Sequence, residues 1–244
     1  MKRQNIRKLI LLISLLLFPV TINYLSPYLI IEGAANGIAS GSLVTFAFLF
    51  ISSLVIGRLW CSWICPSGAF QSLLIPVNGK EARGGKYNLT KYITWTVWIS
   101  IIVFSAMSVG GLHTVDFFYQ TENIISMDSP NVYFVYYTVI TVFLILSLAL
   151  GKRAGCHYIC WMAPFMVIGR KVRNLLQYPS LRLRADTEKC IDCKKCNKVC
   201  PMSLDVNMMV SNHTMENSEC ILCGECIDSC PKDVIGYSFS SGLD

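Results

Sequence analysis

The chain has 244 residues, of which 53% are hydrophobic and only 15% are charged, with a formal net charge of +6. Since soluble domains carry about 25% charged residues, this composition excludes a purely soluble enzyme and a disordered chain, and it predicts a membrane protein. The twelve cysteines make up about 5% of the residues, below the level that marks a small disulfide scaffold.

Two membrane spans are predicted before the first cysteine. We place them at Leu9–Ile31 and Ile38–Leu59, since each holds the ~20 residues that a helix needs to cross a bilayer. Pro19 and Pro27 predict kinks in the first span. The basic N-terminus is also typical of a secretory signal, but the apolar stretch is too long and Ser26-Pro27 is a poor cleavage site. We therefore expect this span to be retained.

A C-x3-C motif, formed by Cys61 and Cys65, closes the second span and is followed at once by Pro66. The apolar stretch after it, residues 66–77, has amphipathic character. Proline is favoured at the first position of a helix, and amphipathic helices lie in the membrane interface. We therefore predict a helix along the inner membrane surface here.

Two further spans are predicted at Tyr92–Leu112 and Val132–Leu150. The loop between them carries several polar residues. A quinol site needs a proton acceptor near the interface, and His113 with Asp116 or Glu122 offers one. Ordinary solvated polarity of a loop is the favoured interpretation of these three residues.

The fourth span ends in a second C-x3-C motif, in which Cys156 lies 95 residues after Cys61 and is followed by Cys160. The apolar stretch 164–177 begins with a proline and predicts another interface helix. The chain is thus an internal repeat, in which two spans and one C-x3-C motif occur twice.

The two C-x3-C motifs together predict a metal site. Residues four apart on a helix share one face with Cβ atoms about 5–6 Å apart, more than the ~3.8 Å that a disulfide needs. Two such pairs, related by a pseudo-twofold axis, predict a third iron–sulfur cluster held by Cys61, Cys65, Cys156 and Cys160. The alternative is four buried small hydrophobic side chains. His157 is interpreted as a polar neighbour of a ligand, or as a ligand itself.

The remaining eight cysteines form two tandem runs after residue 179. Both runs fit C-x2-C-x2-C-x3-C-P, the pattern of bacterial two-cluster ferredoxins, in which the fourth cysteine of each run completes the other cluster. The cytoplasm disfavours disulfides, and zinc favours separated C-x2-C pairs. We therefore predict two [4Fe–4S] clusters, one bound by Cys190, Cys193, Cys196 and Cys230, and the other by Cys220, Cys223, Cys226 and Cys200.

The distribution of Lys and Arg residues along the chain indicates which side of the membrane each loop occupies. With both termini inside, all 21 Lys and Arg residues fall on the inner side and none in the two outer loops, as the positive-inside rule predicts. We expect a multi-pass protein of the inner (cytoplasmic) membrane with cytoplasmic termini, and no nucleic-acid partner. Residues 1–178 form the four-span α-helical membrane domain, built as two tandem two-helix repeats, and residues 179–244 form a small cytoplasmic α+β ferredoxin domain.

On these motifs the chain resembles the NapH-type membrane ferredoxins, which are quinol-dehydrogenase subunits of periplasmic nitrate reduction, and the membrane core of NosR-type proteins. Trp60, Cys61, Cys65, Pro66 and Gly68 fit the family pattern. The second motif departs from it, because Trp161-Met162-Ala163 separates Cys160 from its proline. The resemblance implies electron transfer between a quinone pool, flavoprotein or other membrane partner and the cytoplasmic clusters.

Three functions follow as hypotheses. The first is an integral-membrane electron-transfer subunit of an oxidoreductase complex, without catalytic residues of its own, whose partners are the lipid bilayer and membrane or soluble redox proteins. Lys194, Lys195 and Lys198 are either a docking face for an acidic ferredoxin or flavodoxin, or a solvated face. The second is a polyferredoxin that reduces or holds copper during metalloenzyme maturation. The third is a redox-sensing regulator.

Overall fold

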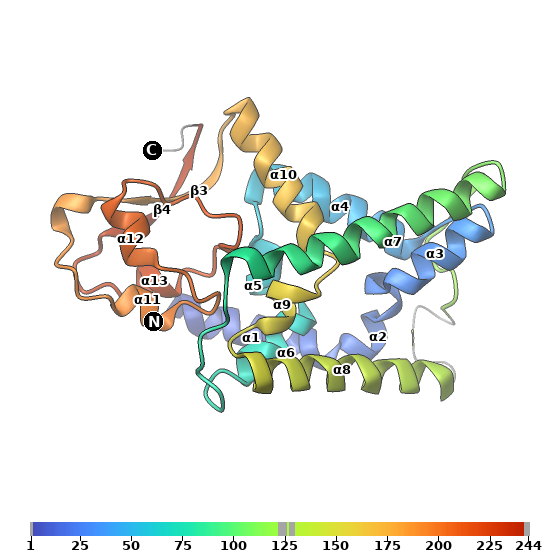
Figure 1. The fold of residues 1–244 in the computed structure, drawn as a ribbon, viewed down its shortest axis with the longest axis horizontal. Coiled ribbons are helices and arrows are strands. Elements are labelled where there is room, and N and C mark those ends of the chain that lie inside the picture. The colour runs from blue at the N-terminus through green and yellow to red at the C-terminus, as the bar shows by residue number, and fades with distance from the viewer. Residues whose placement is uncertain (1, 122–125, 127–129, 242–244) are drawn as a thin grey trace.

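The computed structural model describes residues 2–121, 126 and 130–241. Figure 1 shows long helices beside a small cysteine-rich region that contains the C-terminal strands. Among the described residues, the stretches Gly85–Ser108 and Val132–Leu150 are long and apolar enough to cross a membrane. They contain all of α7 (Leu89–Ser108) and most of α8 (Pro130–Leu150). Only 11% of each apolar window is buried inside the protein, so two of the four predicted spans are helices with surfaces suited to lipid.

The first predicted span is divided rather than kinked. It forms four short pieces, α1 (Lys2–Leu16), α2 (Phe18–Thr21), η1 (Asn23–Leu25) and α3 (Pro27–Ala35). Proline occupies the first turn of both α2 and α3, because its ring prevents the hydrogen bond that would continue the preceding helix. The Ser26 side chain accepts the Leu29 N–H and caps α3. A single continuous helix over this span is therefore wrong.

The second predicted span begins with a strand and contains a short helix. β1 (Ile38–Ser40) pairs in parallel with β2 (Thr114–Asp116), and α4 (Gly41–Ile56) follows directly. The 16 residues of α4 extend about 24 Å at 1.5 Å per residue, less than the ~30 Å hydrocarbon core of a bilayer. The strand pair, which the sequence did not predict, joins the start of the second predicted span to the second predicted outer loop.

Both stretches that follow a C-x3-C motif are helices, as predicted. Each begins with proline in its first turn. The first contacts α1 and α8, and the second lies along α4, so both pack against the bundle. These helices and the one-turn helices before them are α5 (Leu59–Trp63), α6 (Pro66–Leu73), α9 (Ala154–Tyr158) and α10 (Ala163–Leu176).

The cysteine-rich region is closed by an antiparallel strand pair. β3 (Ser180–Ala185) pairs with β4 (Ile235–Ser240) over six residues, so the two ends of the region lie side by side. Leu183, Ile221 and Ile235 belong to the buried core beneath the strands. Both cysteine runs lie between the strands, together with η3 (Thr187–Lys189), α11 (Lys195–Val199), α12 (Val206–Ser211) and α13 (Glu225–Asp228).

The N-terminal turn of α1 docks on the second cysteine run. The Arg3 guanidinium bonds the Asp228 carboxylate at 2.7 Å, and the Gln4 amide donates to the Cys223 carbonyl oxygen at 3.1 Å. Arg7, which is buried, forms an ion pair with Glu225. Arg3 and Arg7, which the positive-inside rule counts only as markers of the inner side, therefore also attach α1 to the cysteine-rich region.

Candidate functional site

The twelve cysteines are free thiols that line three separate cavities, four to each. The cavities are equally small, with about 20 Å³ of enclosed space in each. We call them the inner ferredoxin cavity (Cys200, Cys220, Cys223 and Cys226), the outer ferredoxin cavity (Cys190, Cys193, Cys196 and Cys230) and the CxxxC cavity (Cys61, Cys65, Cys156 and Cys160). Each set is one that the sequence groups together.

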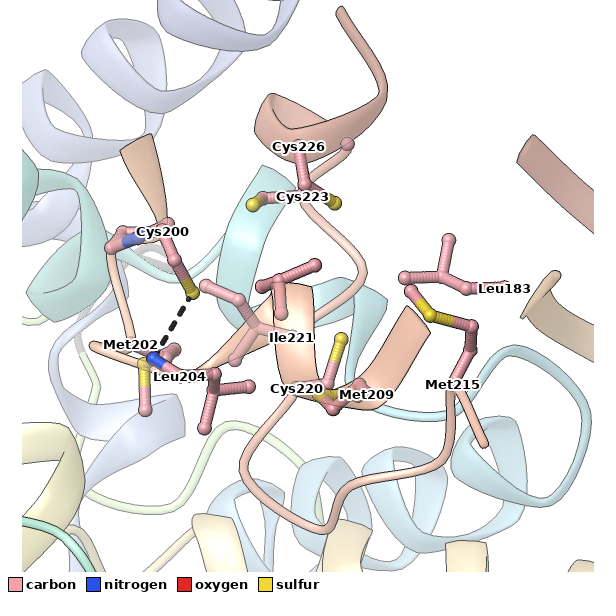
Figure 2. A pocket seen from close by; sticks show the side chains of 13 residues that line it. Leu183, Cys200, Met202, Leu204, Met209, Met215, Cys220, Ile221, Cys223 and Cys226 are labelled. Atoms are coloured by element: carbon pink, nitrogen blue, oxygen red, sulfur yellow. Dashed lines mark hydrogen bonds between the residues drawn. The ribbon is translucent and has the colours of Figure 1, made fainter. Parts of the chain in front are cut away.

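The inner ferredoxin cavity is apolar apart from its thiols. Figure 2 shows its four cysteines around a space walled by Leu183, Ile221 and methionine side chains. The Leu204 N–H points at the Cys200 sulfur at 3.4 Å. Burial raises the pKa of Cys200 to about 12, although this N–H acts in the opposite direction. Cys200 comes from the first run and the other three from the second, so this cavity joins the two runs.

The outer ferredoxin cavity lies at the surface. Cys193 is exposed, and the side chains of Lys194, Lys195 and Lys232 also line the cavity and are exposed. Here Cys230 of the second run joins three cysteines of the first run.

Repeated left-handed residues curl each run around its cavity. Asp192 and Leu222 occupy equivalent positions with φ of 53° and 54°, and Lys194 and Gly224 follow with φ of 54° and 75°. A positive φ is costly for a side chain that carries a Cβ atom. The two runs therefore share one backbone path, and this path turns the three spaced cysteines of each run inward.

The CxxxC cavity is built from two equivalent tight turns. α5 ends between Cys61 and Cys65, and the Cys65 N–H bonds back to the Trp60 carbonyl at 3.0 Å. In the second repeat, the Cys160 N–H bonds the Gly155 carbonyl at the same 3.0 Å. The cysteines of each pair therefore do not share the face of one helix, as the sequence argument assumed. The turn that ends the helix brings the second thiol to the cavity.

Polar neighbours contact the thiols of the CxxxC cavity. The Gln71 amide donates to the Cys156 sulfur at 3.3 Å, and its oxygen accepts the Gly155 N–H at 2.9 Å. Burial raises the pKa of Cys160 to about 12, and the Ala163 N–H opposes this shift. Metal binding requires thiolates, and the N–H groups aimed at the sulfurs favour the thiolate form.

A buried ion network borders this cavity. Glu219, which precedes Cys220, accepts from the Arg58 guanidinium at 3.0 Å and from the Lys91 ammonium at 2.5 Å. The Arg58 and Lys91 side chains are fully buried. Burial alone would raise the pKa of Glu219, but the two cations outweigh it and lower the pKa to about 2. Glu219 is therefore a permanent anion beside a cysteine of the inner ferredoxin cavity.

The sequence argument missed the arginines that border the CxxxC cavity. Arg58 lies three residues before Cys61, and Arg153 lies three residues before Cys156. The fully buried Arg153 donates to the Cys61 carbonyl oxygen at 2.9 Å and to the Ser72 hydroxyl at 2.7 Å. Their equivalent positions in the two repeats were a signal that could have revealed them.

The histidines and outer acids contribute less to the three cavities. The His157 ring is buried beside Asn88, 2.9 Å from its side-chain oxygen, and burial lowers the pKa of His157 to about 4. His157 does not line the CxxxC cavity. His113 and Asp116 are exposed, as the interpretation of solvated polarity expects. Glu122 lies outside the described residues.

The three donor sets suit iron–sulfur clusters. All four donors of each cavity are cysteine sulfurs, the ligands that such clusters use. Among the residues that the structure describes, no three His, Cys, Asp or Glu side chains form a site for a single metal ion. The CxxxC cavity matches the ferredoxin cavities in donor set and in volume, so its residues fit the same kind of group.

Comparisons with known proteins match both cysteine regions. A family model described as a 4Fe-4S binding domain matches residues 39–83 and 133–179, and a 4Fe-4S dicluster domain matches residues 182–231. The first model covers both C-x3-C motifs, and the second covers both cysteine runs. The chain therefore contains 4Fe–4S ferredoxin domains, and the prediction of 4Fe–4S clusters is confirmed.

Several curated proteins are similar over most of the chain. The putative electron transport protein YccM of Escherichia coli is 26% identical over 84% of this chain and 57% of its own length. The ferredoxin-type protein NapH of the same organism is 23% identical over 94% of this chain and 80% of its own. The nitrogen fixation protein FixG of Rhizobium meliloti is 24% identical over 78% of this chain and 40% of its own. No solved structure matches.

Proposed function

Since the chain belongs to the NapH/FixG-like family of 4Fe–4S ferredoxins, we propose that it is an integral-membrane electron-transfer protein that holds three iron–sulfur clusters in a row. The iron–sulfur and electron-transfer parts of this function belong to the family. The third cluster and the membrane topology are our proposal. One observation carries it, namely that all twelve cysteines line three similar cavities in sets of four.

The ligand sets follow from these cavities. In the ferredoxin domain, residues 179–244, each cluster takes three cysteines from one run and the fourth from the other. The third cluster takes both cysteines of each C-x3-C motif. When bound, such clusters transfer single electrons at potentials that the protein tunes.

The chain positions these groups between lipid and water. The inner ferredoxin cavity shares the Glu219–Cys220 segment with the network that borders the CxxxC cavity. The outer cavity opens to the surface through Cys193. This arrangement supports a route from the membrane side through the inner cavity to the outer one, where a soluble partner docks. The apolar walls of the inner cavity exclude water from the middle of the route.

The proposed membrane domain, residues 1–178, crosses the bilayer four times. α7 and α8 supply two crossings. The broken segment α1–α3 and the short helix α4 supply the other two, and their exposed apolar side chains support this assignment, since Leu16 is 70% exposed and Ile51 is 61% exposed. With both termini inside, all 21 basic residues lie on the cytoplasmic side. Alkaline phosphatase fused after Gly111 is then active, whereas a fusion at the C-terminus is inactive.

We infer a quinol or a membrane redox protein as the partner on the lipid side, and an acidic carrier on the aqueous side. Lys194 and Lys195 are exposed at the outer cavity, and Lys198 is exposed nearby on α11. Such a patch accelerates association with an acidic partner in a salt-dependent way. Lys194→Glu with Lys195→Glu lowers the rate of electron transfer to an acidic ferredoxin at low salt. Lys86→Glu, which lies outside this patch, leaves the rate unchanged.

Iron and acid-labile sulfide analysis of the purified full chain, with redox-titrated EPR, tests the proposal. We expect about twelve irons and three signals per chain, and about eight irons in Cys61→Ser, since each cubane holds about four. About eight irons in the unaltered chain would overturn the third cluster. Bound copper that is lost in Cys61→Ser while the iron remains would favour copper handling instead.

A further inference from the structure

Arg58 has two groups of hydrogen-bond donors, and only one of them has partners. Its Nη1 donates to the Ser218 carbonyl oxygen at 2.8 Å and to the Glu219 carboxylate at 3.0 Å. Its Nε and Nη2 are buried and have no partner among the described residues. Leaving donors of a charged group unpaired inside a protein costs free energy, so these N–H groups indicate an acceptor that belongs at this place.

Arg58 forms part of the wall of the CxxxC cavity. It is the only charged residue among the described lining of that cavity. Cys61, three residues after Arg58, also lines the cavity. A cluster held by four thiolates carries net negative charge and has sulfur atoms that accept hydrogen bonds, so it would satisfy both free donors.

The charge around Arg58 is not cancelled by its neighbours. Glu219 supplies one negative charge, and Lys91 and Arg58 each supply a positive charge. Arg153, the equivalent residue of the second repeat, adds another buried cation, but its Nε, Nη1 and Nη2 are all bonded to Cys61 and Ser72. A net positive charge therefore surrounds the cavity, and Arg58 alone of the two arginines has donors to spare.

The two ferredoxin cavities differ from the CxxxC cavity in this respect. No charged residue lines the inner cavity among the residues described. The lysines that line the outer cavity are exposed, and water screens their charge. Hydrogen bonds to the sulfurs and nearby positive charge both favour the reduced, more negative state of a cluster.

We propose that Arg58 is a positioning residue that donates its free Nε and Nη2 hydrogens to the cluster of the CxxxC cavity and raises its reduction potential above those of the two ferredoxin clusters. The inference rests on the proposed third cluster. One electron passes between the CxxxC and inner ferredoxin sites, so one site is oxidised and the other reduced by one unit. Arg58 stays protonated throughout, and no further reactant is needed.

The same side chain also connects the two sites. Its Nη1 holds Glu219, and the next residue, Cys220, lines the inner ferredoxin cavity. Removing Arg58 leaves Glu219 paired with Lys91, so a neutral replacement does not create a lone buried anion. Arg58→Gln is therefore a suitable variant, and Arg58→Lys retains the charge with a different set of donors.

EPR-monitored redox titration of the purified full chain, with iron analysis of each variant, tests this inference. In the unaltered protein, the signal that Cys61→Ser abolishes should titrate at the highest potential of the three. In Arg58→Gln its equilibrium constant for reduction should fall at least tenfold, which is about 59 mV for one electron. Arg58→Lys should give a smaller shift. Arg173→Gln, which removes another fully buried arginine outside the three cavities, should give none.

The outcomes separate the inference from the proposed function. About eight irons in the unaltered chain would overturn the third cluster, and the role of Arg58 with it. Three signals whose midpoints do not change in Arg58→Gln would overturn the role of Arg58 alone, and so would equal shifts of all three. If Arg58→Gln loses the third signal, the Arg58→Lys variant is the test. An unchanged midpoint potential of the third signal in Arg58→Lys would also overturn the inference.

Discussion

The ammonium nitrogen of Lys91 lies 2.5 Å and 2.6 Å from the two carboxylate oxygens of Glu219. The pair joins the first turn of α7 to the residue before Cys220, across 128 positions of the chain. Arg58 bonds the same carboxylate. One anion thereby holds two buried cations at the junction of the predicted membrane domain and the ferredoxin domain.

Glu219→Gln should destabilise the protein strongly. The substitution leaves two buried cations without their anion, and breaking a buried pair in this way costs about 3–5 kcal/mol. Thermal unfolding of the purified chain in detergent measures the loss. Asp186→Asn, which removes an exposed pair with Lys189, is the control and should not change the transition. Equal transitions for the two variants would show that the network is not structural.

Cys200→Ser should alter the cluster of the second cysteine run rather than that of its own run. Cys200 lines the inner cavity with three cysteines of the second run. EPR of the reduced protein should therefore show a changed signal that differs from the signal changed by Cys190→Ser, since Cys190 lines the outer cavity. If both variants alter the same signal, the exchange of fourth ligands between the runs is wrong.

Gly169→Ala should loosen the packing of α10 on α4. A Cβ atom at Gly169 would lie 1.9 Å from the Ser53 hydroxyl oxygen and 3.0 Å from the Phe50 carbonyl oxygen. Overpacking of this kind costs about 1–3 kcal/mol, which thermal unfolding detects. Adding Ser53→Ala removes the closest atom and should restore part of the loss. Gly84→Ala, where the nearest atom lies 3.9 Å away, is the control. No recovery in the double variant would contradict this explanation.

Gln4→Leu should release the start of α1 from the second cysteine run. The Gln4 amide donates to the Cys223 carbonyl and to the Asp228 carboxylate, and losing a buried donor costs about 1–3 kcal/mol. Hydrogen exchange should accelerate in residues 2–8 and 223–228. Lys2→Ala, an exposed position on the same helix, should not change it. Unchanged exchange in Gln4→Leu would mean that the two arginines alone hold α1.

The groups of cysteines were predictable because the motifs themselves set their geometry. Short fixed spacings place three thiols of each run together, and the equal spacing in the two repeats indicated that Cys61 and Cys156 meet. The course of the first span was less predictable. Hydropathy records that residues 9–31 are apolar, but the prolines at 19 and 27 end helices there, and whether a proline bends or ends a helix depends on what its neighbours pack against.

The polar residues at the junction were the hardest to predict. Arg58 and Lys91 fit the positive-inside rule, which counts charges without regard to their partners. Their partner Glu219 lies far away in the chain, and a pairing of this kind leaves no local pattern. The parallel pairing of β1 with β2 was not predicted either, because it leaves no local pattern. Strands of three residues are too short for an alternation of polar and apolar residues to be recognised.

The docking of α1 on the second cysteine run also concerns the order in which the protein is made. α1 leaves the ribosome well before residues 223–228, since Gln4 and Cys223 are 219 positions apart. Arg3, Gln4 and Arg7 therefore have no partners in this segment until it has been synthesised. The contacts that they make form only after residues 223–228 have been synthesised. Protection of α1 against a protease would therefore indicate that residues 223–228 have been synthesised and have docked on it.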